Sequence, residues 1–189
     1  MKRRLGIIAV GVTLLMSTAA LAQSPRWTFV EAGYMDLDPD VGDSADGWFV
    51  GGNFGLKDLP VHFLAQYNEA SFSGGDTDAW LLGGGWHGLL GDRADLLAEL
   101  AYGDRGFDPD GGGSFSESFW TVRAGVRWLV LPILELDGFV ARTEPDDSDS
   151  FTDYEVDAIF QLKRIGLGIG YNVGDDVDTA KAFVRWNFR

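Results

Sequence analysis

The stretch Trp120-Thr-Val-Arg-Ala-Gly-Val-Arg-Trp128 decides the fold of this chain, because its apolar and polar residues alternate without a break. The apolar members are Trp120, Val122, Ala124, Val126 and Trp128, and Arg123 and Arg127 stand between them. Residues two positions apart share one face of a β-strand. The stretch therefore predicts a strand with one apolar face and one charged face.

Two further stretches show where such a strand would lie. Trp48–Leu56 and Trp80–Trp86 repeat the alternation, and their aromatic residues also gather toward the ends of the apolar rows. A soluble core would place its bulkiest side chains in the middle, whereas a bilayer has an interface at each end of a strand. The pattern favours a β-barrel with an apolar outside and a polar inside.

Ten stretches of this kind follow one another, and most are as long as the ~9–11 residues that a tilted strand needs to cross a membrane. They are 27–35, 48–56, 61–70, 79–88, 96–103, 119–129, 133–141, 154–162, 165–172 and 179–188. The prediction is an all-β fold, a single antiparallel transmembrane β-barrel with ten strands. Eight strands are the alternative, if the first is lost or the short ninth merges with a neighbour.

The N-terminus is expected to be a signal peptide covering residues 1–22. Lys2, Arg3 and Arg4 precede an apolar run too short to span a membrane, and Ala20-Leu21-Ala22 is a small-x-small cleavage site. Residues 23–189 then form one outer-membrane β-barrel domain. Its charge becomes −17 instead of −14, which argues against nucleic acid as a partner. Without cysteine it has no disulfide and no thiolate metal site.

The connections between the stretches alternate between short and long. Nineteen of the 29 acidic residues fall in the five long connections, where Arg105 and Arg142 are the only basic residues. Short turns face the periplasm and long loops face outward in barrels of this kind. The acidic loops are either simply solvated or bind divalent cations shared with lipopolysaccharide. Asp36–Gly47 only superficially resembles a calcium loop, because Pro39 intrudes and the twelfth residue is Gly47.

The inward face carries a predicted lumen charge network of six acids and four bases. A buried charge is tolerated only when it is paired and hydrogen-bonded, and a barrel of about eight strands is just filled by its side chains. We therefore expect a salt-bridged, largely occluded lumen; the alternative is an ion pathway. The network comprises Glu31, Glu99, Arg123, Arg127, Glu135, Asp137, Glu155, Asp157, Lys181 and Arg185.

The two histidines, His62 and His87, fall near the short-turn end on the inward face. If Gln66 faces Gly83, they are near cross-strand neighbours, which leaves a hydrogen-bonded pair or a two-histidine metal site as alternatives. No third ligand is evident, so no metal or cofactor is predicted. The loop serines lie at the opposite end from both histidines, so a Ser–His–Asp site is not expected, nor is any other enzyme activity.

The whole chain resembles the small outer-membrane β-barrel proteins of OmpA or OmpX type, whose precursors have about 190 residues. Trp27-Thr-Phe-Val-Glu-Ala-Gly-Tyr34 resembles a first strand of that group. The resemblance implies a C-terminal assembly signal, which Trp186 and Phe188 fit although Arg189 follows them. It also implies the outer-membrane lipid, lipopolysaccharide and the barrel assembly machinery as partners.

The expected function is that of an integral protein of the cell outer membrane with a structural or cell-surface interaction role. One alternative is a narrow pore for ions or small solutes. The other is a secreted, soluble, lipocalin-like barrel that binds a ligand against inward-facing apolar rows. The many glycines on the charged face, such as Gly166 and Gly168, argue against the soluble alternative, because small residues make room inside a narrow lumen.

Overall fold

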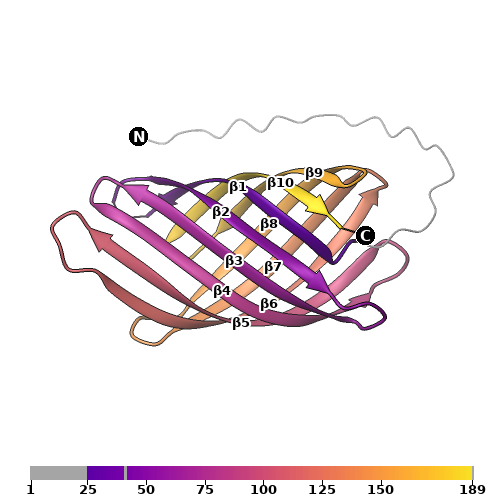
Figure 1. Ribbon diagram of the computed structural model, residues 1–189, viewed down its shortest axis with the longest axis horizontal. Helices are drawn as coiled ribbons and strands as arrows, with labels where there is room; N and C mark the ends of the chain where they lie inside the picture. Colours follow the sequence, from indigo (N-terminus) through magenta and orange to yellow (C-terminus); the bar gives the residue numbers. More distant parts are fainter. Residues whose placement is uncertain (1–24, 41, 189) are drawn as a thin grey trace.

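Ten antiparallel strands close into one barrel in the computed structural model, which describes residues 25–40 and 42–188 (Figure 1). Each strand pairs with its sequence neighbours, and β1 pairs with β10. This confirms the ten-stranded barrel, and the eight-stranded alternative is wrong. The predicted signal peptide lies outside the described residues. The strands are β1 (Thr28–Pro39), β2 (Ala45–Gly55), β3 (Val61–Phe72), β4 (Gly75–Leu89), β5 (Ala94–Pro109), β6 (Phe115–Leu131), β7 (Leu134–Pro145), β8 (Phe151–Leu162), β9 (Ile165–Val173) and β10 (Val177–Asn187).

The outer surface of the barrel carries two girdles of aromatic side chains. Along β6 the girdles are marked by Trp120 and Trp128, both exposed. The strand between them is about 27 Å long at ~3.4 Å per residue, so with strand tilt it fits the ~25 Å apolar band of a membrane barrel. The outer girdle contains Tyr34, Trp48, Tyr67, Trp80, Tyr102, Trp120, Tyr154 and Tyr171, and the periplasmic girdle contains Phe54, Phe63, Trp86, Trp128, Phe160, Trp186 and Phe188.

The apolar rows therefore face outward. Leu82, Val122 and Ile169 are each more than half exposed in the middle of their strands. A soluble barrel would have to leave this belt in water, which the size of the apolar surface forbids. The lipocalin-like alternative is thus wrong. Within the described residues, no helix is long and apolar enough to cross a membrane.

Several strands continue beyond the outer girdle, farther than the alternation predicted. β4 begins at Gly75 instead of residue 79, β5 continues to Pro109 instead of residue 103, and β6 begins at Phe115 instead of residue 119. The β5–β6 hairpin projects at the left of Figure 1, opposite the C-terminus. The alternation of apolar and polar residues ends where the bilayer ends, but backbone pairing between the strands continues beyond it. The strand extensions outside the membrane therefore lack the sequence pattern that marks a membrane strand.

Glycines on the inward face leave room for large neighbours. A Cβ atom built on Gly168 would lie 2.2 Å from the ring of Phe183, and one built on Gly85 would lie 2.6 Å from Cγ of Glu99. The lumen is therefore too narrow for side chains on every inward position. Glycine at these places allows the aromatic and charged side chains to cross the barrel interior.

Candidate functional site

Trp27, the residue before β1, lies inside the barrel at its periplasmic end. Its ring stacks on His62 and His87, with ring centroids 4.6 and 4.1 Å apart. Its Nε1 donates a hydrogen bond to Asp95 Oδ2 at 2.6 Å, and the Arg127 guanidinium lies over the ring at 4.7 Å. These partners come from β3, β4, β5 and β6, so the side chain reaches across the interior. We call Trp27 with these four partners the periplasmic plug.

Arg127 and Arg185 form a charged layer next to the plug. Arg127 pairs with Glu135, and its Nε lies 3.4 Å from Asp137 Oδ2. Arg185 approaches Glu31 at 2.8 Å, Glu135 at 3.3 Å and Asp137 at 3.6 Å. Both guanidinium groups are almost fully buried. Buried charges are tolerated here because each cation faces more than one carboxylate.

An apolar layer crosses the lumen beside these charges. Phe49, Ile159 and Phe183 form a buried cluster, and Phe29 is also buried. The Arg185 guanidinium lies 4.1 Å from the ring centroid of Phe29, a distance that favours a cation–π contact. Together these side chains form an apolar cluster inside the barrel, beside the buried Arg185.

A second charged layer lies toward the outer mouth. Arg123 Nε donates to Glu99 Oε2 at 2.6 Å, and its Nη1 lies 3.6 Å from Glu155 Oε2. Lys181 pairs with Glu155 and lies 3.0 Å from Asp157 Oδ1. The Arg123 side chain is 28% exposed, compared with 3% for Arg127. Exposure therefore falls from the outer half of the lumen to the periplasmic half.

The structure brings all ten residues of the predicted lumen network into ion pairs. The sequence did not single out Trp27 as a plug, nor the apolar layer, because both look like ordinary strand residues. One signal in the sequence could have found them. Trp27, Phe29 and Phe49 occupy alternate positions that face inward like Glu31, and not the positions of the outward-facing apolar row on the same strand.

The histidines lie close together, but not as the sequence predicted. His62 pairs with Gly85, and Gln66 faces Leu81 instead of Gly83, so the predicted register is wrong by two residues. The even shift keeps both rings on the inward face. Their centroids are 5.7 Å apart, and His62 Nε2 lies 2.7 Å from Glu99 Oε1. Among the described residues, no group of three or more histidine, aspartate or glutamate side chains could hold a metal ion.

A separate polar cluster ties the outer loops together above the membrane. Arg105 Nη2 donates to Glu117 Oε2 at 2.6 Å and to Ser148 Oγ at 2.8 Å. Ser148 Oγ and the Asp147 amide donate to the same carboxylate. Partial burial raises the pKa of Glu117, but these hydrogen bonds lower it more, so the pKa lies below its ordinary value. The cluster connects β5, β6 and the loop before β8.

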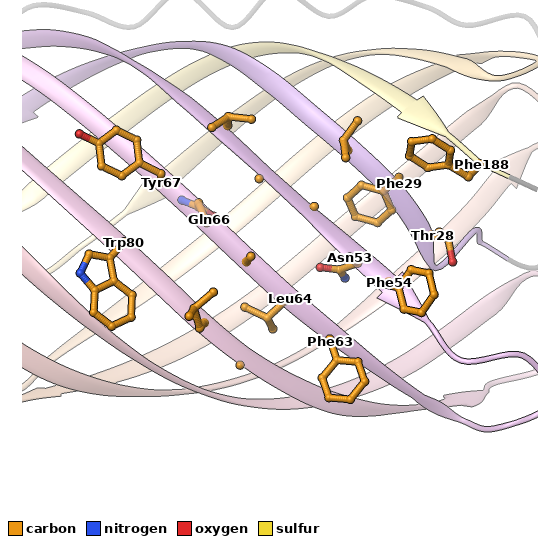
Figure 2. A pocket seen from close by; sticks show the side chains of 17 residues that line it. Thr28, Phe29, Asn53, Phe54, Phe63, Leu64, Gln66, Tyr67, Trp80 and Phe188 are labelled. Carbon is orange, nitrogen blue, oxygen red and sulfur yellow. The ribbon is translucent and has the colours of Figure 1, made fainter.

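A shallow groove of about 1170 Å³ crosses the outer surface over β1 to β4 (Figure 2). The small residues Gly52 and Ala65, which pair across β2 and β3, are among those that line it, and larger girdle side chains stand at its two ends. The labelled side chains at those ends are Tyr67 and Trp80 on one side and Phe54, Phe63 and Phe188 on the other. The groove lies within the apolar belt, so lipid hydrocarbon covers it and it is not a pocket for a water-soluble ligand.

Comparisons with known proteins agree on this architecture. No protein-family model matches the chain, and no curated protein matches it. The NanC porin superposes with a TM-score of 0.53 at 9% identity, over 85% of this chain and 100% of that one. The KdgM porin in complex with disordered oligogalacturonate gives a TM-score of 0.50 at 6% identity, over 85% and 99% of the two chains. Ail of Yersinia pestis gives a TM-score of 0.45 at 14% identity, over 86% and 99%.

The similarities to the two porins show the fold alone and do not assign the chain to the OmpA or OmpX type. The outward-facing apolar belt and the two aromatic girdles are separate physical evidence that the barrel lies in a membrane. The protein is a β-barrel of the outer membrane.

Proposed function

We propose that this barrel is a closed outer-membrane protein with a structural or cell-surface interaction role, and not a pore. The periplasmic plug is the observation that carries the proposal. Trp27 is held by two stacked rings, one hydrogen bond and one cation–π contact. Arg127 Nη1 also donates to the carbonyl oxygen of Arg26 at 2.9 Å, which fixes the chain that carries the plug.

The layers behind the plug support the same function. A solute would have to displace the apolar layer and separate ion pairs on both sides of it. Buried charges left without partners cost several kcal/mol, typically ~3–5. A non-catalytic role is part of the proposal: His62 and His87 are stacked against Trp27 at the periplasmic end.

Planar-bilayer conductance of the purified protein tests the closed lumen. We expect little or no conductance from the wild type and a clear rise for Trp27→Ala combined with Phe49→Ala and Phe183→Ala, because the plug and the apolar layer are both thinned while the strands stay paired. Trp86→Ala is the matched control, since Trp86 is 49% exposed on the lipid-facing surface. A large, steady conductance of the wild type that the combined variant leaves unchanged contradicts the proposal and favours a narrow pore.

The C-terminal aromatic residues support a second, assembly-related part of the proposal. Trp186 and Phe188 are exposed on the outer surface at the end of β10. There they are open to the barrel assembly machinery before β10 pairs with β1. We expect Phe188→Ala to lower the yield of heat-modifiable barrel in the outer membrane. Equal yields of wild type and variant argue against an assembly signal at this position.

A further inference from the structure

Three phenylalanine rings form a row on the inward-facing side of the extracellular extension. Phe72 on β3 stacks on Phe107 of β5, with ring centroids 5.3 Å apart and planes 7° from parallel. Phe115 on β6 follows at 5.1 Å from Phe107 and is 62% exposed. Phe115 lies five positions beyond Trp120 of the outer girdle, so the bilayer does not cover it. We call these three residues the phenyl shelf.

The row exists because β4 has no side chain opposite Phe72. Phe72 pairs with Gly75, which has no side chain, and Phe107 lies opposite Thr77 and Phe115. A Cβ atom on Gly75 would lie 2.3 Å from the carbonyl oxygen of Asp108. Phe72 therefore reaches across β4 to the ring of Phe107, and the shelf spans four strands.

The rim of the phenyl shelf is acidic. Asp43 and Asp110 are exposed on the loops beside the rings, whereas Asp76 and Asp108 pair with each other on the opposite, outward face of the strands. Ser73 donates a hydrogen bond to Asp43, and the Asp110 amide donates to the Gly74 carbonyl, which draws the three loops together. The basic residue of this region, Arg105, is bonded to Glu117 and Ser148, so its charge is neutralised locally.

We infer that the phenyl shelf is a docking surface for a cationic amphipathic peptide segment of another protein. Apolar side chains of such a segment cover the exposed Phe115 ring and the half-buried rings of Phe72 and Phe107 beside it, and its lysine or arginine side chains meet the carboxylates of Asp43 and Asp110. The inference deepens the proposed surface-interaction role and rests on it. A second copy of this chain is the poorer occupant, because its outer loops carry the same negative charge.

Binding of a synthetic peptide to the full barrel tests the inference. The protein is placed in zwitterionic lipid nanodiscs, and a fluorescent twelve-residue peptide of alternating lysine and leucine is titrated against it, with protein-free nanodiscs as the blank. A peptide of alternating glutamate and leucine is the charge control. We expect saturable binding of the lysine peptide, weakened by added salt because exposed charges are screened.

Two variants locate the binding. Phe115→Ser should weaken affinity about tenfold, because burial of one exposed aromatic side chain is lost. Asp43→Asn combined with Asp110→Asn should weaken affinity and flatten the salt dependence. Leu90→Ser is the matched control, since Leu90 is 55% exposed on a periplasmic turn. Heat-modifiable gel mobility verifies that each variant is folded.

The outcomes separate this inference from the closed-lumen proposal. Equal binding of the acidic peptide, or affinity unchanged by both shelf variants, overturns the docking surface. If the protein binds no peptide but forms a dimer that Phe115→Ser abolishes, the shelf serves self-association. That result also overturns the proposed peptide-docking surface. Peptide binding by a barrel that conducts freely contradicts the closed lumen alone. A closed barrel that binds no peptide contradicts the phenyl shelf alone.

Discussion

Arg185→Met tests whether the lumen charges hold the barrel together. The Arg185 side chain is 4% exposed and faces three carboxylates at 2.8, 3.3 and 3.6 Å. Methionine preserves most of the volume against Phe29, so lost packing contributes little. Removing one partner of a buried ion pair typically costs ~3–5 kcal/mol. We expect a loss of about 3–5 kcal/mol in the free energy of unfolding.

The pair with Glu31 provides a double-mutant cycle. In the described part of the chain, Arg185 is the only ion-pair partner of Glu31. Glu31→Gln alone should cost about 1.5–3 kcal/mol, the value of a hydrogen bond to a charged group. The double variant should cost less than the sum of the single variants by at least ~1 kcal/mol, because the second change removes a charge that the first leaves unpaired.

Urea unfolding in detergent micelles, followed by tryptophan fluorescence, measures these free energies. Arg105→Met is the matched control, because Arg105 is 40% exposed and its surface ion pair is worth only about 0–1 kcal/mol. The reasoning fails if Arg185→Met costs no more than Arg105→Met. It also fails if the Glu31 and Arg185 changes are additive.

Three further predictions concern the chain end, the lipid face and the lumen packing. Mass spectrometry of the membrane-extracted protein should find Gln23 as the first residue, and an uncleaved chain would contradict the signal peptide. Ala124→Arg should cost ~2–4 kcal/mol, the penalty for a cation at the bilayer midplane, whereas Ser114→Arg in an exposed loop should be neutral; similar costs in urea unfolding would mean that Ala124 does not face lipid. Gly33→Ala should cost about 1–3 kcal/mol through overpacking, because its Cβ would lie 2.3 Å from the Ala182 carbonyl oxygen, while Gly138→Ala meets no atom within 4 Å and should be tolerated. Equal melting temperatures for the two glycine variants would contradict the packed lumen.

The membrane-spanning part of the fold could be predicted from sequence because the bilayer imposes a strict rule on every strand. The strand from Trp120 to Trp128 has one apolar face, so the alternation of its residues alone determines which side chains face lipid. The same alternation placed Arg123 and Arg127 inside. Once these side chains share a narrow interior with carboxylates, pairing is the arrangement that lowers their free energy.

Other features were not predictable because no such rule acts on them. The extension of β5 to Pro109 lies in water, where both faces of a strand can be polar. The register of β3 against β4 depends on the tight turn near Gly74, and a shift of two residues preserves every inward side chain. The position of Trp27 depends on contacts with four strands that are distant in sequence, which local patterns do not encode.

The contact between Glu31 and Arg185 has a consequence for how the barrel enters the membrane. These residues face each other across the β1–β10 seam, 154 positions apart, so their pairing exists only after the first and last strands have met. In an open sheet, Arg185 would lack Glu31 and meet hydrocarbon at a cost of ~2–4 kcal/mol. Insertion hairpin by hairpin is therefore uphill until the seam joins. Closure of the seam and membrane entry are therefore expected to be coupled, and contacts this distant in sequence favour slow folding.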